Sequence, residues 1–155
     1  MDTVPFHAWI AHLPVALSMV LPLLASGVLL AWRRAWLPRQ TWVIVVAMQA
    51  VLFAGAMIAE RSGHQDEKRI ADVVSAEALE AHEESAETFA WVSGVAVLVS
   101  LTVLAMHNPA AAQTLAGVAI GVMTVVTMLG YRAGAAGLEL VYRHGAAGAP
   151  AASRR

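Results

Sequence analysis

Residues 13–32 read LPVALSMVLPLLASGVLLAW and contain no Asp, Glu, Lys or Arg. A helix needs roughly 20 apolar residues to cross about 30 Å of hydrocarbon, so this run is long enough to span a bilayer. Three further windows without these charged residues cover 40–59, 88–106 and 110–131. The sequence therefore predicts four membrane-crossing helices.

The composition supports this interpretation. The chain has 155 residues, of which 59% are hydrophobic and 14% charged, whereas soluble domains carry about 25% charged residues. We expect an all-α, integral membrane four-helix bundle with short loops and one longer acidic loop that extends the third helix. Four crossings leave room for one domain only, over residues 1–148, followed by a disordered tail at 149–155. The N-terminus lacks the basic stretch of a signal peptide, so its apolar run is expected to be retained.

Between the predicted helices, the connections differ in character. The turn RRAWLPRQ (33–40) is basic, and Trp32, Trp36 and Trp42 around it suggest an aromatic belt at a membrane interface. Residues 60–87 hold nine of the eleven acidic residues, and SGHQDE (62–67) within them is predicted to break the second helix near residue 59.

The later helix boundaries are predicted from local signals. The third helix should begin near Ser75, before the membrane, and the fourth should have Pro109 in its first turn. After residue 131, the glycines of RAGAAGLELVYRHGAAG (132–148) predict irregular structure.

Counting crossings places most of the histidines together. With four spans, the N-terminus, the 60–87 segment and the C-terminal segment lie on one side of the membrane, and the two short turns lie on the other. The histidines that share the first side are His7, His12, His64, His82 and His144. His107 lies on the opposite side. Histidines at the ends of apolar helices are candidates for a functional site.

Residue chemistry alone leaves the roles of these histidines open. His12 and His82 are each balanced between a ligand and an interfacial or solvated side chain. His7 lies about 140° around a regular helix from His12, so the two cannot both point at one atom without a kink. With no cysteine in the chain, thiolate metal sites and covalent haem attachment are excluded. Zinc held by histidine and carboxylate, and a copper or haem site that uses Met57 or Met128, stay possible.

Other features concern helix packing. Gln49 lies in the middle of the second span and should form a hydrogen bond across the bundle. Gly117 and Gly121 form a G-x-x-x-G pair, which lets helices approach closely. We favour packing inside the bundle for this pair over a homodimer interface. Neither a nucleotide-binding motif nor a basic nucleic-acid-binding stretch is present, and no nucleic-acid partner is expected.

Three motifs, in order along the chain, resemble one family. They are HAWIAHLPVAL (7–17), AERSGHQDE (59–67) with LEAHEESAE (79–87), and GAAGLELVYRHG (134–145). They are similar to the histidine motifs of the domain-of-unknown-function 2231 family of predicted bacterial membrane proteins. The resemblance covers nearly the whole chain. It implies that His7, His12, His82 and His144 occupy the characteristic histidine positions, and that the protein lies in the bacterial inner membrane. Relatives joined to Rieske-type or cytochrome c domains imply a redox setting, but this chain has no such domain.

Together, these observations predict a b-type haem electron carrier rather than an enzyme with its own substrate. His12 and His82 are the expected axial ligands, and His7 and His144 are alternative ligands or partners of the haem propionates. A quinone or a soluble cytochrome would be the redox partner, and membrane lipid surrounds the bundle. One alternative is a protein that binds or transports copper, zinc or iron through the same histidines. The other is a structural subunit of a membrane complex.

Overall fold

The chain folds into four long helices, which confirms the predicted all-α fold. The computed structural model describes the backbone of residues 6–70 and 75–142, and the side chains of residues 12–63 and 75–139. The helices are α1 (Phe6–Arg33), α2 (Trp42–Ile70), α3 (Ala76–Ala105) and α4 (Pro109–Tyr142), with a short 3-10 turn, η1 (Arg39–Thr41), before α2. Within these described ranges there is no strand.

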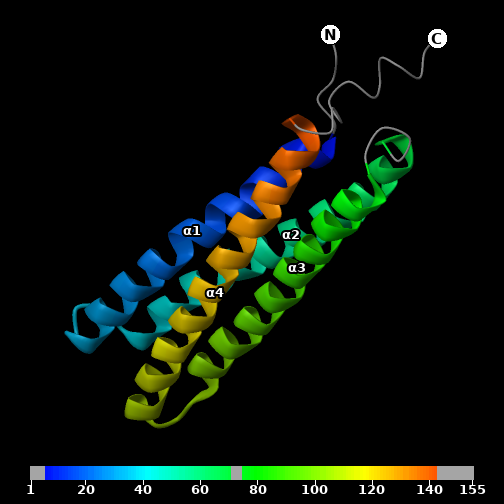
Figure 1. Ribbon diagram of the computed structural model, residues 1–155. Helices are drawn as coiled ribbons and strands as arrows, with labels where there is room; N and C mark the ends of the chain where they lie inside the picture. The colour runs from blue at the N-terminus through cyan, green and yellow to red at the C-terminus, as the bar shows by residue number, and fades with distance from the viewer. Residues whose placement is uncertain (1–5, 71–74, 143–155) are drawn as a thin grey trace.

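The helices form a four-helix bundle in which α1 packs on α2, α2 on α3, α3 on α4 and α4 on α1. The beginning of α1, the end of α2, the beginning of α3 and the end of α4 lie at one end of the bundle (Figure 1). We call this the histidine end, and we call the opposite end, formed by residues 33–41 and 106–109, the turn end. The predicted alternation of crossings is therefore confirmed for the helix ends.

All four helices are long and apolar enough to cross a membrane. The candidate spans are His12–Arg33, Arg39–Gly63, Ala76–Ala105 and Pro109–Glu139. Large apolar side chains point away from the bundle, among them Leu23, Leu98 and Met128 at 75, 64 and 63% exposure. An outer surface of this kind is suited to lipid rather than to water. The chain is a multi-pass membrane protein by these criteria.

The interior is built from inward-facing stripes in which small residues are frequent. Along α3, the buried residues follow the helical repeat, with intervals of three or four from Ala90 onwards; they are Phe89, Ala90, Ser93, Ala96, Ser100 and Val103. The Ser100 hydroxyl donates a hydrogen bond of 2.7 Å to Gln49 Oε1 on α2, and both side chains are buried. The predicted hydrogen bond of Gln49 across the bundle is confirmed.

Two helix starts follow the local signals. Ser75 precedes α3, and its hydroxyl accepts a hydrogen bond from the backbone N–H of Ala78. Asn108 does the same for α4, because its Oδ1 accepts from the N–H groups of Ala110 and Ala111 at 2.9 and 3.2 Å. Pro109 therefore occupies the first helical position, where its missing N–H costs nothing. Both predictions are confirmed.

Two helix ends were wrongly predicted. Helix α2 does not break at SGHQDE but continues to Ile70, so the expected polar turn at His64 is helical. Helix α4 continues to Tyr142 through Gly134 and Gly137. A glycine in a helix costs only about 1 kcal/mol relative to alanine, and neighbouring packing outweighs that cost. Polarity in these segments marks the helices leaving the membrane, not their ends.

The tryptophans also differ from the expected aromatic belt. Trp36 is 71% exposed and Trp32 is half-buried, but Trp42 is fully buried. Trp42 lies in register with Val45, Gln49 and Leu52 on the inward face of α2 and therefore belongs to the core.

The G-x-x-x-G pair faces outward. Gly117 and Gly121 are exposed, and a methyl group added at either would meet no atom within 4 Å. The expectation that they pack inside the bundle is wrong, because the inward stripe of α4 runs through Ala112, Ala116 and Ala119 instead.

At the turn end, Arg39 joins the two hairpins of the bundle. Its guanidinium donates hydrogen bonds to the backbone carbonyls of Leu104 and Met106, at the C-terminus of α3. These carbonyls are at the negative end of the helix dipole and have no partner within the helix. Arg39 therefore supplies both the charge and the donors that this helix end requires.

Helix α1 ends in a Schellman motif. The N–H of Trp36 bonds to the carbonyl of Ala31 at 2.9 Å, and the N–H of Ala35 bonds to that of Trp32 at 3.0 Å. The motif needs a left-handed residue, which is usually glycine. Here it is Ala35, with φ of 56°.

Replacing Ala35 with glycine is therefore expected to stabilise the protein. Glycine adopts this φ without the steric cost of a Cβ, and the expected gain in the free energy of unfolding is about 0.5–1 kcal/mol. Thermal unfolding followed by circular dichroism in detergent measures it. Ala105→Gly, at the last residue of α3, is the control and should destabilise the protein. A lower melting temperature for Ala35→Gly would contradict the assignment.

Candidate functional site

The packing near the histidine end sets the register of the helices. A methyl group added at Gly130 of α4 would lie 2.9 Å from Ser18 Oγ of α1 and 3.0 Å from Phe89 Cε2 of α3. The Thr127 hydroxyl also donates a hydrogen bond to the backbone carbonyl of Ser18. Three helices therefore meet at one level, which we call the Gly130 layer and define by Ser18, Phe89 and Gly130.

His82 lies on the inward side of α3. It is seven residues before Phe89, and seven residues return to within about 20° of the same helix face. The side chain is half-buried, and its Nδ1 atom is fully enclosed. A methyl group added at Gly137 of α4 would lie 3.2 Å from Cε1 of the imidazole. The absence of a side chain at Gly137 thus makes room for the His82 ring.

His12 lies at a similar level but on another face. Counted from the Gly130 layer, six residues place it about 9 Å towards the histidine end, and seven place His82 about 10 Å in the same direction. The His12 side chain is exposed. The inward stripe of α1 contains Pro14, Ser18 and Leu21, and His12 is not part of it. The expectation that His12 is the inward-facing histidine is not met.

His7, unlike His12, falls on the helix face of α1 that carries the inward stripe. It lies in the first turn of α1, seven residues before the buried Pro14, so the two backbone positions fall near the same helix face. The side chain of His7 is outside those described, as is that of His64, and His144 lies outside the described residues altogether. His107 is exposed at the turn end.

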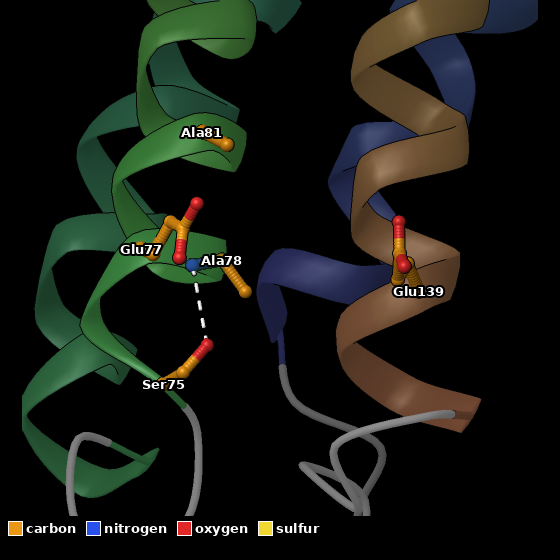
Figure 2. Close-up of a pocket in the computed structure, with 5 residues that line it drawn as sticks. All are labelled: Ser75, Glu77, Ala78, Ala81 and Glu139. Carbon is orange, nitrogen blue, oxygen red and sulfur yellow. Dashed lines mark hydrogen bonds between the residues drawn. The ribbon is translucent and has the colours of Figure 1, made fainter.

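A hollow of about 310 Å³ opens between the beginning of α3 and the end of α4 (Figure 2). It is lined by Ser75, Glu77, Ala78 and Ala81 of α3 and by Glu139 of α4. Ala78 and Ala81 precede His82 by four residues and by one residue along α3, and their small side chains line the hollow. Glu139 was not recognised from the sequence, because its approach to α3 depends on the helical continuation of α4.

The hollow and its surroundings constrain what can bind. Two carboxylates attract cations and repel the propionates of a haem. Among the described side chains, no group of three or more His, Cys, Asp or Glu residues is arranged to hold a metal ion. Met57 packs half-buried against the core, while Met128 is 63% exposed and faces away from the bundle.

Fold and site together define a helical membrane protein with four spans, in which His82 of α3 packs against α4. Comparison of the chain with protein-family models, with curated proteins and with solved structures gives no match. Membership of the domain-of-unknown-function 2231 family therefore stays a prediction from the motifs.

Proposed function

We propose that the protein binds a b-type haem at the histidine end and carries single electrons in the bacterial inner membrane. The observation that supports this most is the position of His82. Its imidazole lies on the inward stripe of α3, with Nδ1 enclosed and Gly137 opposite. A half-buried imidazole at the end of an apolar bundle has the chemistry of a haem ligand.

His82 would supply one imidazole to such a group, and a second imidazole would be required from another helix. Helix α1 carries the candidates at the same end of the bundle. His12 is exposed, whereas the register of Pro14 and Ser18 favours His7. We therefore propose that His82 and a histidine of α1 would hold the haem, with His7 favoured over His12. A haem held by two imidazoles supplies one-electron transfer and leaves no open position on iron.

The roles of the other residues follow from their chemistry. Glu77 and Glu139 keep the haem propionates out of the hollow between α3 and α4. The buried stripe from Phe89 inward excludes water from the side of the membrane interior, and a low-dielectric surrounding raises the influence of ligand charge on the redox potential.

A second candidate function is binding of a divalent cation. Glu77 and Glu139 line the hollow together with Ala81, the residue before His82, and carboxylate with imidazole suits zinc, copper or iron. The described residues bring together no complete ligand set there, so this candidate is second.

The visible spectrum of the purified full chain, expressed with adequate haem, tests both. We expect a reduced α-band that disappears in His82→Ala and in His7→Ala and persists in His12→Ala. His107→Ala, at the turn end, is the matched control and should leave the band unchanged. Circular dichroism checks that every variant is folded.

Three outcomes would change the assignment. Loss of the band in His12→Ala instead of His7→Ala would assign the second ligand to His12. A colourless protein with stoichiometric metal by elemental analysis would replace haem with the metal ion. A protein that binds neither haem nor a metal ion would support the alternative of a structural subunit in a membrane complex.

A further inference from the structure

The turn end carries uncompensated positive charge. Arg33 is the last residue of α1 and Arg34 follows it in the turn, and both are exposed; Arg39 lies further along, at η1. Neither residues 3–59 nor residues 88–138 contain an Asp or Glu, so the acidic residues of the described helices lie at the histidine end. Arg39 is engaged with the carbonyls of α3. Arg33 and Arg34 are therefore the arginines that face outward from this end.

Apolar side chains lie directly beside these arginines. Trp36 is 71% exposed and Leu37 is 38% exposed, and the Arg34 guanidinium lies 5.8 Å from the centroid of the Trp36 ring. The Schellman motif at Ala35 fixes the direction in which the chain leaves α1, and with it the approach of Arg34 to Trp36. The pairing holds a cation and an amphipathic ring next to each other.

The depth of these residues in the membrane indicates what kind of molecule they bind. The span of α1 ends at Arg33, and that of α2 begins at Arg39, so the residues between them lie at the level of the lipid headgroups. Tryptophan is suited to this zone because its ring is apolar and its N–H is polar. A guanidinium group can donate two parallel hydrogen bonds to the oxygens of one phosphate group.

We propose that Arg33, Arg34 and Trp36 form a binding site for the headgroup of an anionic phospholipid. The two guanidinium groups would contact the phosphate diester, and Trp36 and Leu37 would lie against the upper part of the acyl chains. A free phosphate ion would meet the arginines but gain nothing from the apolar pair. The site is at the opposite end from the proposed haem and does not depend on it.

Native mass spectrometry of lipids retained by the purified full chain tests the proposal. The protein is presented with equal amounts of phosphatidylglycerol and phosphatidylcholine in detergent. Each arginine near an anionic surface favours anionic lipid severalfold, so we expect roughly tenfold enrichment of phosphatidylglycerol for the unmodified chain. The variant R33Q/R34Q should lose most of this enrichment, and Trp36→Ala should lose part of it. Excess inorganic phosphate should not displace the lipid.

Arg61→Gln is the matched control, because Arg61 is an exposed arginine at the histidine end; it should keep the enrichment. Equal retention of the two lipids by the unmodified chain would overturn the proposal. So would unchanged enrichment in R33Q/R34Q, or an equal loss in Arg61→Gln. Displacement by inorganic phosphate would show a simple anion site instead of a lipid site.

Discussion

Replacing Gly130 with leucine is expected to lower the free energy of unfolding by about 3 kcal/mol, at the upper end of what overpacking costs. A single methyl group at this position would already lie 2.9 Å from Ser18 Oγ and 3.0 Å from Phe89 Cε2. Both side chains are buried, and the Ser18 hydroxyl donates a hydrogen bond to the carbonyl of Val15. Leucine would therefore force α1 and α3 away from α4.

Gly117→Leu is the matched control on the same helix. It makes the same chemical change at a position with no atom within 4 Å of an added methyl group. Because leucine is the better helix former by nearly 1 kcal/mol, this variant should unfold at the same or a higher denaturant concentration. Unfolding in mixed detergent and sodium dodecyl sulfate, followed by circular dichroism, measures both. Equal destabilisation in the two variants would contradict the close approach at the Gly130 layer.

Replacing Gly137 with leucine is expected to remove haem binding while leaving the bundle folded. A methyl group here would lie 3.2 Å from Cε1 of His82, and the rest of a leucine side chain would displace the imidazole. The position is near the end of α4, beyond the Gly130 layer, so the cost to the core is small. On the proposed function, the reduced α-band should fall at least tenfold for the same protein concentration.

Gly134→Leu makes the same change at a position where an added methyl group would meet no atom within 4 Å, and it should retain the band. The NMR chemical shifts of the His82 ring provide a readout that does not depend on haem. They should move in Gly137→Leu and stay in place in Gly134→Leu. Shifts unchanged in Gly137→Leu would contradict the contact itself; moved shifts with an intact α-band would argue against His82 as the haem ligand.

The crossings and helix starts were predictable because strong local signals encode them. A charge-free run such as 13–32 has few alternatives to spanning a membrane. Ser75 and Asn108 place a side-chain acceptor where the first N–H groups of a helix need one. The ends of α2 and α4 were not predictable in the same way. Glycine and polar residues suggest a break in a helix. A helix that leaves the membrane nevertheless continues in water if its residues favour the helical conformation.

The site was predictable only in part. The seven-residue spacing from His82 to Phe89 is visible in the sequence, and it places His82 on the inward face once Phe89 is known to be buried. The same reasoning applied to Pro14 would have favoured His7 over His12. Neither the contact of His82 with Gly137 nor the position of Glu139 in the hollow could be predicted, because both depend on how α3 and α4 align.

The hydrogen bonds of Arg39 have a consequence for the order of assembly. Arg39 belongs to the hairpin of α1 and α2, whereas the carbonyls of Leu104 and Met106 that accept its hydrogen bonds belong to the hairpin of α3 and α4. Synthesis delivers the donor first and the two acceptors 65 and 67 residues later. Until the second hairpin has inserted, the guanidinium must be satisfied by water or headgroups. The guanidinium of Arg39 therefore forms its hydrogen bonds with the end of α3 late in assembly, when both hairpins have inserted.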